Sequence, residues 1–358
     1  MIMLNCDNES VMEKGGNQSH TRLLKYDLLK VFACFLVIWG HVIMHLYDSD
    51  YVSNPIYRAI YSFHMNLFMM ISGWFSLSSM KMTSKPFFVK KAKQLIYPCI
   101  AWGVFTMLLS DGIKILEDEP LRFTPSNMMS DLYWYSDFWF LKSCFVCYSL
   151  AFLGTRTKMK KWLWVAVTLL LSQLIPVFQI PFMYPSFLLG MLLKESKSLM
   201  DIIRKYKFAI CFLFIIMLLF WTEEAWVGSH ELSALIKESR MPVADIFLLR
   251  LYRLVIGLLG ALSFFVIFDA VGDSVFATDG FRKLSILGKF SLEIYIVHTV
   301  VFVELLFKYI SFTAISYWPF NLLVVPIVSL IVLFTTYKLI DIIYKFPVLS
   351  KLLFAKQI

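Results

Sequence analysis

The sequence contains few charged residues. Asp, Glu, Lys and Arg together make up 16% of the 358 residues, where about 25% is usual for soluble domains. Hydrophobic residues make up 59%, and they recur in apolar runs along the chain instead of forming one block. A water-soluble core of this size cannot use that much apolar surface. The composition therefore excludes a soluble globular protein and predicts an all-α, polytopic membrane protein.

The short motifs of common soluble enzymes are also missing. GxSxG, HExxH, P-loop and GxGxxG patterns are absent. The sequence has only six cysteines, and they lie mostly inside apolar runs. We therefore expect no disulfide framework. Cys144 and Cys147 form a CxxC pattern, but it falls in a predicted span without partner ligands. We interpret it as packing and predict no metal site.

Three regions are expected along the chain. Residues 1–26 are polar and charged with no apolar core, so we expect a cytoplasmic segment rather than a cleavable signal peptide. Residues 27–344 form a single transmembrane domain, and residues 345–358 form a cytoplasmic tail. The first span then also acts as the targeting element.

A transmembrane helix needs about 20 apolar residues, and the apolar runs predict ten spans. They are 27–46, 56–79, 94–110, 137–153, 162–175, 182–193, 208–222, 246–270, 285–310 and 318–344. Long loops are expected at 111–136 and 223–245.

Basic residues are concentrated on one predicted side of the membrane. With the N-terminus inside, the inner segments carry 22 Lys and Arg and the outer loops carry four. This positive-inside bias predicts that both termini are cytoplasmic. It also accounts for the net charge of +9 without a nucleic-acid partner. Pro176 and Pro181 could instead mark one kinked helix, giving nine spans, but the basic residues of 194–207 would then lie outside.

Ionisable side chains inside a bilayer cost at least about 2.5–3.5 kcal/mol and indicate function by default. Most of the basic residues in the spans lie near membrane edges, where snorkelling explains them. Lys142 and Arg253 lie deeper, below the outer ends of their spans. The histidines reach a similar level: His41 lies about 21 Å and His298 about 20 Å from the inner end, and His64 about 12 Å from the outer end.

This coincidence of depth predicts a polar chamber in the outer half of the membrane. The alternative is that each histidine satisfies one interhelical hydrogen bond, worth about 0.6 kcal/mol. For His41 we favour function, because an enclosed imidazole suits proton abstraction from a hydroxyl group.

Four segments, in this order, resemble motifs of the acyltransferase-3 family of integral-membrane O-acyltransferases, which modify cell-surface sugars and other small acceptors. They are Tyr26-Asp27-Leu28-Leu29-Lys30 through Trp39-Gly40-His41, Phe63-His64-Met65-Asn66 through Ser72-Gly73-Trp74, Trp139-Phe140-Leu141-Lys142, and Leu287-Gly288-Lys289-Phe290-Ser291 through Tyr295-Ile296-Val297-His298. The resemblance covers about residues 20–300, and ten spans fit it. No hydrolase-like domain is expected, so the chain resembles the stand-alone form.

The resemblance implies transfer of an acyl group, most simply acetyl, from acyl-CoA to a hydroxyl of a cell-surface saccharide or its lipid-linked precursor. It places the protein in the inner (cytoplasmic) membrane, with acetyl-CoA as co-substrate and no bound cofactor. His41 would be the catalytic base, and Asp27 and Lys30 would belong to the site. Candidates for binding the acceptor or stabilising the oxyanion are His64, Lys142, Arg253, Tyr295 and His298, among which the sequence does not choose. Candidates for binding CoA are Lys90, Lys91 and Lys93.

The chain departs from the family pattern at three places. The family usually has Arg at the position of Lys30, often Pro at that of Asn66, and Arg pairs where this chain has lysines near residue 90. The main rival interpretation is a proton-coupled secondary transporter, which also uses intramembrane His, Lys and Arg. Such folds usually contain a repeat between their halves, and none is visible here. A scaffold protein without chemistry is the second rival.

Overall fold

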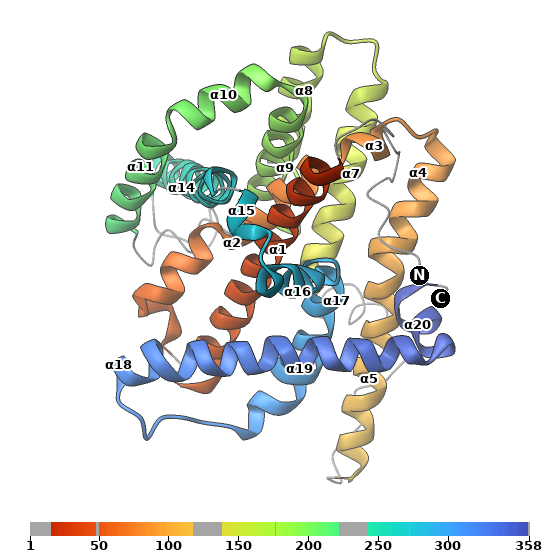
Figure 1. Cartoon of the computed structure of the whole chain (residues 1–358), viewed down its shortest axis with the longest axis vertical. Coiled ribbons are helices and arrows are strands. Elements are labelled where there is room, and N and C mark those ends of the chain that lie inside the picture. The colour runs from red at the N-terminus through yellow and green to blue at the C-terminus, as the bar shows by residue number, and fades with distance from the viewer. Residues whose placement is uncertain are drawn as a thin grey trace.

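A computed structural model describes residues 16–47, 50–116, 138–175, 177–221, 242–271 and 273–356, and its regular elements there are all helical (Figure 1). The helices of the first half are α1 (Gly16–Leu46), η1 (Tyr51–Ser53), α2 (Pro55–Trp74), α3 (Leu77–Met80), α4 (Ser84–Lys91), η2 (Ala92–Ile96), α5 (Tyr97–Leu116), α7 (Trp139–Arg156), α8 (Lys161–Gln173) and α9 (Ile180–Glu195). Those of the second half are α10 (Lys197–Lys205), α11 (Lys207–Leu219), α14 (Val243–Ala270), α15 (Asp273–Phe276), α16 (Asp279–Gly288), α17 (Ser291–His298), η4 (Thr299–Leu306), η5 (Phe307–Tyr309), α18 (Tyr317–Pro319), η6 (Phe320–Val324), α19 (Val325–Lys345) and α20 (Pro347–Phe354).

Several helices are long and apolar enough to cross a membrane. Among the described residues there are 4 of them: Leu24–Leu46, Ser84–Leu109, Val243–Ala270 and Tyr317–Lys345. A bent helix pair raises the number to 5. The all-helical, multi-pass membrane class predicted from the sequence is thus confirmed, whereas the count of ten spans and the orientation stay predictions.

Two predicted segments differ in the structure. The predicted inner loop before the third span is helical, because α4, η2 and α5 follow one another without a break from Ser84 to Leu116. Lysine is a good helix former, so its charge alone did not indicate a loop. The predicted span 285–310 is instead broken between α16 and α17, whose axes differ by 65°.

The α8 and α9 helices are separate elements that pack against each other, not one kinked helix. The chain reverses between them at Phe178 and Gln179, which have φ of 53° and 54°. Two successive left-handed residues other than glycine are costly unless their surroundings hold them in place.

Helix α1 lies in the middle of the molecule and packs against α2, α14, α16, α17 and α19 (Figure 1). Helices α2 and α9 approach so closely that a Cβ on Gly73 would lie 1.9 Å from the Phe187 carbonyl oxygen. Asn66 fastens the same pair, because its amide donates to the Phe182 carbonyl (3.0 Å) and the Ser186 hydroxyl (2.9 Å). The residue that departs from the family pattern therefore has a structural role here.

Ion pairs connect the ends of distant helices. The Lys25 ammonium lies 2.7 Å from Asp269, and the Arg204 guanidinium lies 2.7 Å from the other oxygen of the same carboxylate. The sequence predicts these three helix ends on the inner side, and the ion pairs bring them together. At the C-terminal end, α20 packs on α5, and Lys356 forms an ion pair with Glu293 of α17.

Candidate functional site

The predicted functional residues of the first helix, Asp27, Lys30 and His41, lie along one face of α1 together with Cys34. Asp27, Lys30, Cys34 and His41 are spaced by three, four and seven residues, and side chains at such spacings are neighbours on a helix surface. The rise from Lys30 to His41 is about 16 Å. One stripe of α1 thus connects a charged end to an intramembrane histidine.

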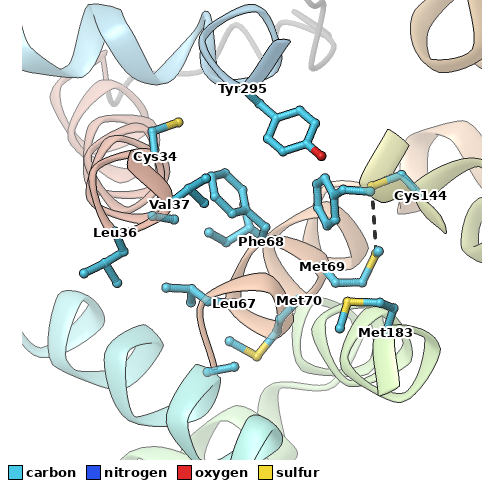
Figure 2. Packing of buried hydrophobic residues seen from close by; sticks show 14 of the residues in the cluster. Cys34, Leu36, Val37, Leu67, Phe68, Met69, Met70, Cys144, Met183 and Tyr295 are labelled. Atoms are coloured by element: carbon cyan, nitrogen blue, oxygen red, sulfur yellow. Dashed lines mark hydrogen bonds between the residues drawn. The ribbon is translucent and has the colours of Figure 1, made fainter. Parts of the chain in front are cut away.

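A small cavity opens along this stripe. It has an empty volume of about 150 Å³ and is lined by Cys34, Val37, Phe68, Ile294, Tyr295 and His298. Figure 2 shows four of these side chains, with Cys34 and Val37 on α1, Phe68 on α2 and Tyr295 reaching over them from α17. Pockets for whole drug-sized ligands measure about 300–1,000 Å³. The space here lies below that range even with its opening to the surface included, so it marks a gap between α1, α2 and α17 and not a preformed ligand pocket.

His41 lies beside His298, one of the residues that line the cavity. Their ring centroids are 5.4 Å apart, with an angle of 56° between the ring planes. The His298 Nδ1 atom lies 2.7 Å from the carbonyl oxygen of Ile294 in its own helix. The other face of His41 stacks on His45, at 6.0 Å between centroids. The structure thus brings together two of the three histidines predicted to share one depth, and His298 also lines the cavity.

The bend between α16 and α17 places His298 beside α1. A Cβ at Gly288 would lie 2.1 Å from the carbonyl oxygen of Asp27, so only glycine allows this approach. Three residues after Gly288, the carbonyl oxygen of Ser291 accepts a hydrogen bond from the Cys34 thiol at 3.7 Å. The glycine and serine of the late motif therefore dock α17 on the α1 stripe.

Asp27 and Lys30 form an ion pair at the other end of the stripe. The Lys30 ammonium lies 2.9 Å from the Asp27 carboxylate, and both side chains are 17% exposed. The same ammonium lies 4.8 Å from the centre of the Phe75 ring, a cation–π distance. Lys30 is thus held in place while part of its surface stays accessible.

His64 approaches the histidine pair from α2. Its Nδ1 lies 2.8 Å from the Ile60 carbonyl oxygen, and its ring is 4.5 Å from the Tyr61 ring. Tyr61 packs on the backbone of Gly40, the residue before His41, where a Cβ would lie 2.2 Å from the tyrosine ring. His64 and His41 are close enough to interact electrostatically. The site therefore contains one histidine from each of three helices.

The two deep cations gather at another place. Lys142 lies 5.4 Å from the Phe178 ring, and the Arg253 guanidinium reaches the Gln179 side chain at 3.5 Å. Both cations thus contact the left-handed reversal between α8 and α9. Arg253 also lies within electrostatic reach of His64, which makes it the cation nearer to the histidines.

The three lysines near residue 90 point in different directions. Lys91 is buried, with its ammonium 3.6 Å from the centre of the Tyr148 ring. Lys90 is half-buried and Lys93 is exposed. The helical geometry of α4 and η2 thus separates these side chains, and they do not form one cradle.

Sequence reasoning missed Glu293, which is fully buried on α17. Its carboxylate accepts a hydrogen bond from the Tyr344 hydroxyl at 2.9 Å and is paired with Lys356. An acidic residue inside a predicted span was a signal that could have found it, since only the basic residues of the spans were weighed. Tyr61 carried no such signal. In the described part of the chain, no three His, Cys, Asp or Glu side chains gather as a metal ion would require.

Comparison with known proteins gives two curated relatives. The chain is 27% identical over 218 residues to a nodulation protein, NolL, of Mesorhizobium japonicum, which covers 56% of this chain and 54% of the relative. It is 25% identical over 196 residues to NolL of Sinorhizobium fredii, which covers 50% of each. The chain spans about half the length of these relatives. No solved structure matches it significantly.

The family comparison covers nearly the whole chain. A family model described as an acyltransferase domain matches residues 23–339. The match takes in the α1 stripe, the α16–α17 bend and both histidines that face each other. The chain therefore belongs to the acyltransferase-3 family of membrane proteins.

Proposed function

We propose that this protein is a membrane-embedded O-acyltransferase that transfers an acyl group from acyl-CoA to a hydroxyl of a cell-surface saccharide or its lipid-linked precursor. The observation that carries the proposal is the α1 stripe, on which Lys30, the cavity and His41 follow one another. Family membership supports acyl transfer. The donor, the base and the acceptor are our assignments.

The stripe suits a CoA thioester entering from the inner side. Lys30 offers a cation to the diphosphate, and the exposed Lys93 adds charge further out. The rise of about 16 Å from Lys30 to His41 is comparable with the length of an extended pantetheine arm. The thioester would then lie beside Tyr295 and His298, where α1, α2 and α17 would have to move apart to admit an acetyl group.

His41 acts as the general base in this scheme. Its imidazole takes the proton of the acceptor hydroxyl as that oxygen attacks the thioester carbonyl carbon. The tetrahedral intermediate then collapses, the carbon–sulfur bond breaks, and the CoA thiolate takes the proton back from the imidazolium. Tyr295 is our first candidate for stabilising the oxyanion, since it is one of the residues that line the cavity, and preorganised donors of this kind typically contribute about 10²–10³ in rate.

Two assignments follow from the same reasoning. His64 and Arg253 lie on the side of α2 and α14, where they suit contact with the acceptor, and Lys142 supports the reversal next to them. The expected setting is the inner membrane of the cell, with both termini cytoplasmic and the acceptor approaching the outer half of the bilayer.

The test is thiol release from acetyl-CoA by the purified chain with an envelope glycan fraction as acceptor. A second measurement determines the base-labile O-acetyl content of envelope glycans in cells that lack the gene. His41→Ala should lower turnover by about 10²–10⁴. His45→Ala, one turn along the same helix and exposed, is the matched control and should retain it.

Each outcome decides one element of the proposal. If wild type consumes acetyl-CoA and His41→Ala does not, at equal membrane level, donor and base are both supported. Full activity of His41→Ala contradicts the base. Absence of acetyl-CoA consumption by wild type contradicts the donor and favours the transporter interpretation.

A further inference from the structure

Two histidine nitrogens in the site are buried without a hydrogen-bond partner. Among the described residues these are Nδ1 of His41 and Nε2 of His298. A buried polar atom without a partner costs about 1–3 kcal/mol, so two of them on facing rings need an explanation. The other titratable groups facing His41 are His45 and His64, with Glu304 and Lys308 beside His45.

The tautomer of His298 is fixed by its own helix. The Nδ1 atom lies 2.7 Å from the Ile294 carbonyl oxygen, and a carbonyl oxygen only accepts, so Nδ1 carries the proton. In the neutral ring Nε2 then has a lone pair and can only accept. His298 thus presents a fixed acceptor inside the site.

His41 is the donor that this acceptor can reach. An imidazole nitrogen lies about 1.1 Å from its ring centre, so rings 5.4 Å apart can bring two facing nitrogens to about 3.2 Å, a hydrogen-bond distance. His45 cannot replace His298, because it stacks on His41 with only 17° between the ring planes, and a stacked ring offers its face rather than a nitrogen. The contact requires a change in ring orientation, because neither nitrogen has a hydrogen-bond partner in the structure.

We infer that His298 is the positioning residue of the catalytic histidine: its Nε2 accepts a hydrogen bond from Nδ1–H of His41 and so leaves the His41 Nε2 lone pair for the acceptor hydroxyl. Bases in hydrolytic triads are oriented by a third group in the same way. Here the third group is a neutral imidazole held by a backbone carbonyl. The arrangement places no carboxylate next to the base, within a bilayer where an unpaired carboxylate is costly.

The proton moves as in the proposed function, on which this inference rests. It passes from the acceptor oxygen to Nε2 of His41 and on to the leaving thiolate, while the Nδ1 proton stays on His41. His298 steadies the imidazolium that forms between these steps. It gains and loses no proton itself, so it needs to be an acceptor but not a base.

Three substitutions at one position test this role by thiol release from acetyl-CoA with the envelope glycan fraction. His298→Leu removes the acceptor and should lower kcat by about 10²–10⁴ with little change in KM for acetyl-CoA. His298→Gln offers an amide oxygen near the position of Nε2 and should stay within tenfold of wild type. His298→Asp places an anion beside His41, which favours the imidazolium, so the lower limb of the pH–rate profile should move to higher pH.

The outcomes separate this inference from the proposed function. If His41→Ala is inactive while His298→Leu is fully active, the proposed function stands and the positioning role is wrong. If Gln and Leu at residue 298 are equally inactive although both proteins are folded by size-exclusion chromatography, His298 acts as a base and the inference is overturned. An active His41→Ala enzyme contradicts both. Rescue by Gln together with the shifted pH limb of the Asp variant supports the positioning role, because a purely structural histidine would produce neither.

Discussion

Gly288→Ala is the substitution for which the structure predicts the sharpest effect. The new methyl carbon would lie 2.1 Å from the Asp27 carbonyl oxygen and 2.7 Å from its carbonyl carbon. Both are backbone atoms and cannot rotate away, so α16 must move from α1 by about 1 Å to restore ordinary contact. Overpacking of this kind costs about 1–3 kcal/mol.

Gly280→Ala is the matched control in the same helix. No atom lies within 4 Å of a Cβ at Gly280, and replacing a helical glycine by alanine gains about 0.5–1 kcal/mol. Both variants gain this term, so they should differ in unfolding free energy by the overpacking cost of about 1–3 kcal/mol. At about 2–4 °C per kcal/mol for domains of 150–250 residues, this corresponds to several degrees in the unfolding temperature.

The same displacement of α16 should also lower the rate of acyl transfer. Gly288 immediately precedes the bend that places His298, and a misplacement of about 1 Å at a reacting group can cost 10²-fold in rate. Thermal unfolding in detergent and thiol release from acetyl-CoA measure the two effects. The reasoning is refuted if Gly288→Ala unfolds at or above the temperature of Gly280→Ala.

Two further substitutions test the ends of the site. Lys30→Arg should retain most of the turnover, because the guanidinium keeps the ion pair with Asp27 and matches a diphosphate. Lys30→Met should raise KM for acetyl-CoA. An inactive Lys30→Arg variant would mean that this end of the site does not bind CoA in the proposed way. Lys356→Met leaves the buried Glu293 carboxylate without its cation and should lower the unfolding free energy by up to about 3 kcal/mol. Its unfolding temperature should therefore be lower than that of the control Lys351→Met, which alters an exposed lysine. Equal temperatures for these two lysine variants would contradict a stabilising role of the pair.

Much of the architecture was readable from local signals. Apolar runs and inner basic residues predicted a helical membrane protein, and four motifs in order predicted the family. The broken span 285–310 was not predictable in this way, because Gly288 and Lys289 interrupt the apolar run but do not by themselves dictate a bend. Its bend is associated with the approach of Gly288 to Asp27, a contact between residues far apart in the sequence.

The site shows the same division. The shared depth of His41 and His298 followed from counting residues along two helices, and the structure places their ring centroids 5.4 Å apart. The role of Glu293 could not be deduced, since its partners Tyr344 and Lys356 lie 51 and 63 residues further along the chain. The different exposure of Lys90, Lys91 and Lys93 could not be deduced either, because it depends on which side of the helix each residue lies.

The contact between α1 and α17 has a consequence for biosynthesis. His41 is in α1, and its partner His298 is made more than 250 residues later. Lys356, which neutralises Glu293 on α17, is translated later still. A nascent chain cannot assemble the reactive pair until almost all of this sequence has left the ribosome. Stalled or proteolysed fragments that retain α1 are therefore expected to be catalytically silent, so incomplete translation products would not consume acyl-CoA.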